Sequence, residues 1–129
     1  MAEKLLYHFT AKRFVDAIKS DGLTRGVVLK TLSPITFMSD WQWLTSNPKW
    51  EQSWAAGTGR LPYKRNEVRL TVVIPSSETE RCRPWSQVKF LVDPSVAQTL
   101  SSYGDPENWW LFSGRVDPSW ITEIEVPRG

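Results

Sequence analysis

The sequence has one cysteine and one histidine among its 129 residues, and these scarcities exclude several classes of protein. A single cysteine, Cys82, forms neither an internal disulfide nor a cysteine metal cluster, and its charged surroundings favour an incidental loop thiol. Phosphate-binding glycine motifs and zinc-ligand spacings are also absent. No apolar run approaches the roughly 18–20 residues that cross a bilayer, and the N-terminus lacks the apolar core of a secretory signal. These absences favour a cytoplasmic protein without membrane contact or a bound metal.

Net charge is also low. Sixteen lysines and arginines stand against fourteen aspartates and glutamates, which gives a formal charge of +2. Broad nucleic-acid binding usually shows as a strong basic excess, so this balance does not favour it. One local basic cluster, formed by Arg60, Lys64 and Arg65, has two interpretations. It is either a solvated loop or part of a surface that holds a single nucleic-acid strand by charge and stacking.

The residue pattern predicts one domain, spanning 1–129, of the α+β class. Its length suffices for one core, and 40% hydrophobic residues indicate a globular chain. Strands are predicted at 4–9, 27–29, 35–38, 41–45, 68–74, 88–92, 109–112 and 121–126. Helices are predicted to begin at Thr10, at Asn47 and at Asp93, with Gly22 ending the first of them. Helices that gather in the N-terminal half favour α+β over alternating α/β.

Tryptophan is abundant. The eight tryptophans stand at positions 41, 43, 50, 54, 85, 109, 110 and 120. Most are expected in the core because each indole buries a large apolar area. A site that stacks a flat ring also needs aromatic side chains, and tryptophan is favoured at the centres of protein interfaces.

The only histidine, His8, is predicted near the end of the first strand. A neutral imidazole there can hydrogen-bond a sugar hydroxyl or a substrate carbonyl from either ring nitrogen. The alternative is an ordinary strand-end histidine whose ring donates to a nearby backbone carbonyl. The pattern alone leaves both interpretations open.

Three further segments of the sequence carry candidate site residues. Glu107 precedes a predicted strand, where a carboxylate could polarise a hydroxyl or stabilise a positive transition state, or could simply be a solvated loop acid. Trp43 could stack a heteroaromatic ring while Thr45 or Ser46 supplies a hydrogen bond, or it could belong to the core. Arg69 is either an outward-facing charge or a phosphate contact.

The Tyr-His-Phe-Thr run at 7–10, the amphipathic helix pattern with Ile18, and the Gly-Leu pair at 22–23 resemble the opening of small ADP-ribosyltransferase-like domains. The segment 116–121 resembles the closing segment of small domains of this type, many of them phage-borne. The resemblance implies a split β-sandwich of about six strands, with short helices mainly in the N-terminal half. It also implies that NAD binds in the cleft of that sandwich.

The resemblance implies roles for individual residues. His8 would orient the nicotinamide-side ribose, and an aromatic ring near Trp43 would pack on the nicotinamide. Glu107 would engage the ribose 2′-hydroxyl and stabilise the positive charge that develops as nicotinamide leaves. Catalysis is therefore expected from His8 and Glu107, and NAD binding from His8, Thr10, Trp43, Thr45 and Arg69.

Two functions follow from the resemblance. The first is NAD-dependent ADP-ribosylation of a macromolecular target, most directly a protein. The second is a catalytically inactive relative that blocks a host protein by stoichiometric occupation, as a phage-type inhibitor does. The tryptophan content suits the second function, because tryptophan is favoured at binding hot spots.

Overall fold

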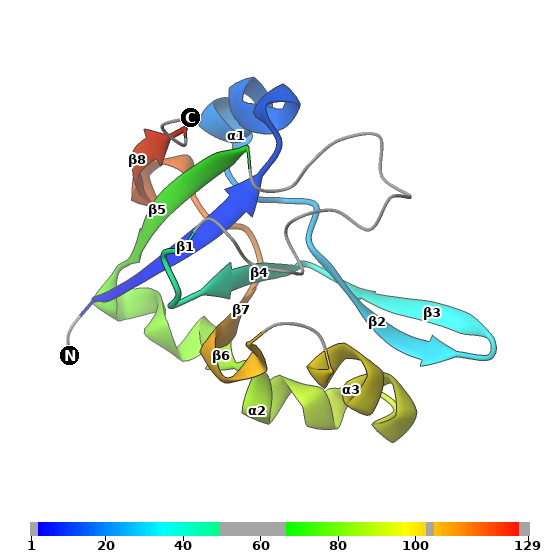
Figure 1. Cartoon of the computed structure of the whole chain (residues 1–129). Helices are drawn as coiled ribbons and strands as arrows, with labels where there is room; N and C mark the ends of the chain where they lie inside the picture. Colours follow the sequence, from blue (N-terminus) through cyan, green and yellow to red (C-terminus); the bar gives the residue numbers. More distant parts are fainter. Residues whose placement is uncertain (1–2, 50–66, 103–104, 127–129) are drawn as a thin grey trace.

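A six-stranded antiparallel sheet organises the chain, as the computed structural model in Figure 1 shows. The structure describes residues 3–49, 67–102 and 105–126. Within these ranges the strands are β1 (Lys4–Thr10), β2 (Val27–Leu32), β3 (Ile35–Ser39), β4 (Trp41–Thr45), β5 (Val68–Ile74), β6 (Cys82–Pro84), β7 (Trp109–Ser113) and β8 (Ile121–Glu125). The main sheet has the order β6-β7-β4-β1-β5-β8, while β2 and β3 form a separate hairpin.

Short helices connect the strands. The α-helices are α1 (Val15–Asp21), α2 (Trp85–Val88) and α3 (Pro94–Ser101). Short 3₁₀ helices are η1 (Lys12–Phe14), η2 (Ser76–Arg81), η3 (Lys89–Leu91), η4 (Pro106–Asn108) and η5 (Pro118–Trp120). The predicted mixture of helix and sheet is thus confirmed, and none of the helices in the described residues is long and apolar enough to span a membrane.

The strand β5 explains why the sheet forms where it does. Its sequence, VRLTVVI, is rich in β-branched residues, which suit a pleated and buried surface. It pairs with β1 over seven residues, from Lys4 opposite Ile74 to Thr10 opposite Val68. Pro75, which has no N–H for a ladder, follows it immediately. The predicted strands 4–9, 41–45 and 68–74 are therefore confirmed almost to the residue.

Each face of the sheet carries its own core. On one face, Leu6, Leu70 and Phe112 are buried together with Ile18 of α1. On the opposite face, Leu111 and Trp109 pack with residues of α2 and α3, among them Trp85, Val88 and Val96. Because side chains alternate between faces along a strand, the neighbours Leu111 and Phe112 serve different cores. The hairpin β2–β3 extends away from this body as an arm (Figure 1).

The first helical segment begins one residue later than predicted. Thr10 is the last residue of β1, and Ala11 takes the N-cap position without any side-chain cap. Gly22 ends the segment as predicted, with φ of 79° and its N–H donating to the Ile18 carbonyl at 2.8 Å. A side chain at this position would collide with the Val116 carbonyl, so both the left-handed conformation and the lack of a Cβ are required.

The strand predicted at 88–92 is wrong. Val88 ends α2, and Val92 follows η3. Both valines are buried while Phe90 and Leu91 between them are exposed, so the spacing of four residues is helical and not alternating. With α2 and α3 in the second half of the chain, the expectation of helices mainly in the N-terminal half is also wrong. The short edge strand β6 was not predicted.

The helix predicted to begin at Asn47 extends beyond the described residues. Asn47 does accept the Lys49 N–H through its side chain, as a capping residue would. Trp50, Trp54 and the loop 57–62 lie outside the described residues, and so do Arg60, Lys64 and Arg65.

Candidate functional site

The main sheet opens between β1 and β4. These strands pair only at Tyr7 and Thr45, whereas β1 pairs with β5 along its whole length. Beyond that single pair, towards Thr10, the two strands separate. The His8 ring bridges the separation, with Nδ1 at 2.7 Å from the Trp43 carbonyl oxygen. This β1–β4 opening is the candidate site.

The His8 hydrogen bond fixes the tautomer of the ring. A carbonyl oxygen only accepts, so Nδ1 carries the proton and donates it to Trp43. Burial lowers the pKa of His8 below its ordinary value of 6.5, although the Trp43 carbonyl acts in the opposite direction. The ring is therefore neutral at pH 7 and its Nε2 is a hydrogen-bond acceptor. The ring donates to a backbone carbonyl, as the ordinary interpretation expects, and still keeps one nitrogen for a ligand.

The indole side chain of Trp43 is held in a fixed orientation by its neighbours. Its indole N–H donates to the Val27 carbonyl at 2.9 Å. Its ring contacts Trp85 at a centroid distance of 5.5 Å and Trp109, edge to face, at 5.7 Å. The ring is half-buried, and it packs against the core between the sheet, α2 and α3. Trp43 thus belongs to the core on one side, as the alternative interpretation expected, while its carbonyl orients His8.

Thr45 and Ser46 bind the end of β4 to neighbouring segments. The buried Thr45 hydroxyl accepts the Asn47 N–H at 3.0 Å. The Ser46 hydroxyl donates to the Asn108 side-chain oxygen at 2.9 Å, and the Ser46 N–H donates to the Asn108 carbonyl. Both residues therefore help to position the segment that carries Glu107.

Glu107 lies in η4 with its side chain exposed, directly before β7. The strands β1, β4 and β7 are consecutive in the sheet, so the three elements that carry the candidate residues are neighbours. Tyr7, Thr45 and Trp109 lie opposite one another on these strands and form a row across the sheet. His8 follows Tyr7 by one residue, and Glu107 precedes Trp109 by two residues. His8 and Glu107 therefore lie on opposite sides of this row, on elements that β4 separates. A ligand that touches both side chains has to span this row.

A polar network beneath Glu107 was missed by the sequence analysis. Asp105 accepts two side-chain amide hydrogen bonds through one oxygen, from Asn47 at 2.8 Å and from Asn108 at 2.9 Å. The first bond joins segments 58 residues apart. Only the Asp-Pro pair at 105–106, typical of a turn, could have indicated it.

The remaining candidates differ in position. Thr10 is buried two residues beyond His8 on the same strand. Arg69 donates to the Pro48 carbonyl at 2.8 Å and to Glu125 at 2.9 Å, and its guanidinium lies 5.5 Å from the Tyr7 ring centroid. A phosphate contact at Arg69 would have to share the guanidinium with these partners.

Cys82 lies away from this site, on the edge strand β6 and not in a loop. It is buried, and burial raises the pKa of its thiol to about 11. An unreactive thiol is the consequence. Among the described residues there is no cluster of three metal-ligating side chains.

Fold and site together define an α+β domain with a six-stranded antiparallel sheet and a neutral imidazole in an opening between its central strands. No known protein family matches the chain, and no curated protein or solved structure is significantly similar to it. The chain's own residues are therefore the sole basis for assigning a function.

Proposed function

We propose that this protein binds NAD at the β1–β4 opening and transfers ADP-ribose to a macromolecular target, in the manner of the ADP-ribosyltransferases that its sequence resembles. The observation that carries the proposal is the His8–Trp43 hydrogen bond. It holds a neutral imidazole in a gap of the sheet and leaves an acceptor nitrogen to which no described residue donates.

The residues around the opening have the chemistry that such a ligand requires. His8 Nε2 can accept a ribose hydroxyl. The rings of Tyr7 and Trp43 offer apolar surface on the same two strands, on the face of the sheet opposite Leu6 and Leu44. The exposed carboxylate of Glu107 can accept a second ribose hydroxyl and stabilise positive charge on the sugar. When bound, NAD supplies a ribose whose bond to nicotinamide breaks as the acceptor nucleophile attacks and loses its proton.

The direct test is incubation of the whole chain with isotopically labelled NAD and a cell lysate. Label transfer to a macromolecule and release of nicotinamide are expected. Glu107→Gln should lower the rate at least about 100-fold, as expected for loss of a charge-stabilising group, while the exposed control Glu123→Gln should leave it unchanged. No transfer and no nicotinamide release at any protein concentration would exclude catalysis.

A second function, stoichiometric binding of a protein, is favoured by a different observation. The arm exposes four large apolar side chains, with relative exposures of 45% for Val27, 49% for Leu32, 66% for Ile35 and 58% for Phe37. Exposed apolar groups of this size are typical of protein interaction surfaces. The two functions separate in one experiment, because Glu107→Ala abolishes an enzymatic effect on the target and leaves inhibition by occupation intact.

A further inference from the structure

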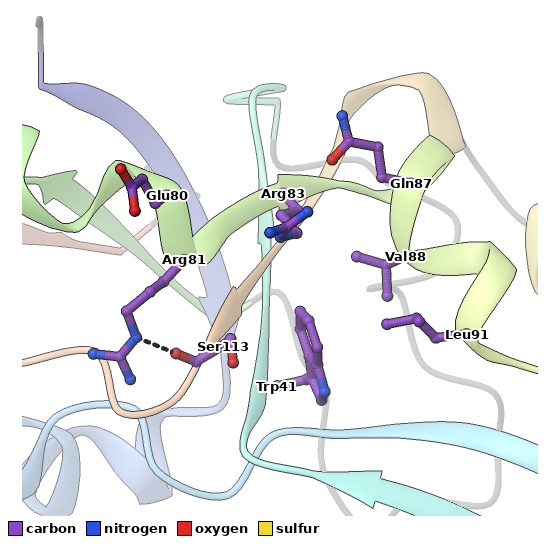
Figure 2. Close-up of a pocket in the computed structure, with 8 residues that line it drawn as sticks. All are labelled: Trp41, Glu80, Arg81, Arg83, Gln87, Val88, Leu91 and Ser113. Atoms are coloured by element: carbon purple, nitrogen blue, oxygen red, sulfur yellow. Dashed lines mark hydrogen bonds between the residues drawn. The ribbon is translucent and has the colours of Figure 1, made fainter.

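A hollow lies at the β6 edge of the sheet, apart from the β1–β4 opening. Its volume is about 410 Å³, within the range of about 300–1,000 Å³ found for small-molecule sites. Its lining includes Trp41 from β4, Arg83 from β6 and Ser113 from β7, with Gln87, Val88 and Leu91 from the α2–η3 segment (Figure 2). We propose that this edge hollow binds one nucleotide unit, with the base against Trp41 and a single phosphate at Arg83.

Trp41 supplies the flat surface. The ring is half-buried and packs in part against the core formed with α2 and α3, so its orientation is fixed. Figure 2 shows the ring near Ser113, Val88 and Leu91. A base stacks best on an aromatic ring whose orientation is fixed and whose neighbours are apolar. Such stacking does not select one base, because every base has a π-face.

The two arginines of the hollow differ in what they already bind. Arg81 is held in place: its Nε donates to the Ser113 carbonyl at 2.8 Å and its Nη1 lies 3.3 Å from a Glu78 carboxylate oxygen. Arg83 is exposed, and its side chain makes no hydrogen bond or ion pair with any residue in the described part of the chain. Its planar guanidinium is therefore available to bind a phosphate through two parallel hydrogen bonds, as a bidentate pair.

The charge of the hollow limits how many phosphates it accepts. Arg81, Arg83 and Glu80 line it, which leaves one net positive charge, and Arg81 is already paired with Glu78. A monophosphate or a phosphodiester suits this balance, whereas a triphosphate brings charge that nothing compensates. The Gln87 amide adds an NH₂ donor group and a carbonyl acceptor for the edge of a base.

Titration calorimetry of the whole chain with adenosine monophosphate tests the proposal. Arg83→Gln should weaken binding about tenfold or more, as loss of a charge-assisted pair does, and Trp41→Leu should do the same through lost stacking. Lys19→Gln on α1 removes equal charge from a remote exposed site and should change nothing. Glu80→Gln should tighten binding, and adenosine triphosphate should bind no tighter than the monophosphate.

Several outcomes would overturn the assignment. These are equal losses in Arg83→Gln and Lys19→Gln, tighter binding of the triphosphate, or no binding at millimolar ligand. Binding that disappears in His8→Ala would belong to the β1–β4 opening instead, so failure of this proposal is distinguishable from failure of the proposed function. If Trp41→Leu does not fold, as judged by its thermal unfolding, the Arg83 and Glu80 variants decide alone.

A second titration identifies the source of the nucleotide. A short fluorescent oligothymidylate, followed by anisotropy, reports binding of a single strand. Tighter binding than the free monophosphate, with the same dependence on Arg83 and Trp41, assigns the hollow to a nucleic-acid strand. Binding of the monophosphate alone assigns it to a free nucleotide, and an oligothymidylate that binds equally to all variants does not use the hollow.

Discussion

The imidazole of His8 donates to the backbone carbonyl of Trp43 at the place where β1 and β4 stop pairing. A carbonyl that loses its strand partner needs another donor, and here a side chain provides it. The same bond selects one tautomer of the only histidine in the chain. Structural and ligand-binding roles of His8 are thus compatible, since they use different ring nitrogens.

Protonation of His8 should destabilise the fold in weakly acidic solution. The folded-state pKa lies below the ordinary value of 6.5, so below that pH the unfolded chain binds a proton that the folded chain does not. The free energy of unfolding should therefore fall as pH decreases from 6.5, by at most about 1.4 kcal/mol per pH unit for one proton. Urea unfolding of wild type and His8→Asn at several pH values measures this, and equal pH profiles would contradict it.

Removing the Asp105 carboxylate should destabilise the segment that carries Glu107. Asp105→Ala leaves two side-chain amide groups, of Asn47 and Asn108, without their acceptor. The expected loss is about 1–3 kcal/mol in urea unfolding. Asp93→Ala is the matched control, because Asp93 precedes α3 without any side-chain cap, and it should change stability by no more than about 0.5 kcal/mol. Similar losses in both variants would show that the network has no special role.

Gly22 should not tolerate a side chain. Gly22→Ala has to adopt a positive φ and displace the Val116 carbonyl, so the expected cost is about 1–3 kcal/mol of unfolding free energy. The exposed helix position Ser20 provides the comparison, since Ser20→Ala should be close to neutral. A stable Gly22→Ala protein would mean that this turn is not required for folding.

Cys82 should be slow to alkylate in the native protein. With a pKa raised from 9.0 to about 11, its thiolate fraction at pH 8 is about 100-fold below that of an ordinary cysteine, and burial reduces access further. Iodoacetamide labelling followed by mass spectrometry should show little reaction until urea unfolds the chain. Rapid native labelling would place the thiol at an accessible surface.

The parts of the fold that were predictable share one property, a pattern local to the strand. The strand β4 was found because its residues are aromatic and alternate weakly, and β5 because a run rich in β-branched residues ends at a proline. The segment 88–92 failed because its two valines could belong to a strand or to a helix, and only packing against Trp85 and Val96 decides between them. The three-residue strand β6 exists because β7 lies beside it, which no local pattern reveals.

The candidate site was predictable in its residues but not in its geometry. His8 was identifiable as a lone imidazole near a strand end, yet its bond to Trp43 depends on the strands being adjacent and diverging. The Asp105 network depends on contacts between segments far apart in the sequence. The edge hollow draws its aromatic ring and its unpaired guanidinium from β4 and β6, and no sequence motif joins these two strands.

The arm has a consequence for handling the protein in concentrated solution. The outer strand β3, Ile-Thr-Phe-Met-Ser, contains no charge and, among the described residues, pairs with β2 alone. An exposed edge strand that is apolar and uncharged can pair through its backbone with a strand of another chain. Two molecules could pair their β3 strands at Phe37 and form one continuous four-stranded sheet. Aggregation of the purified protein should therefore begin at β3.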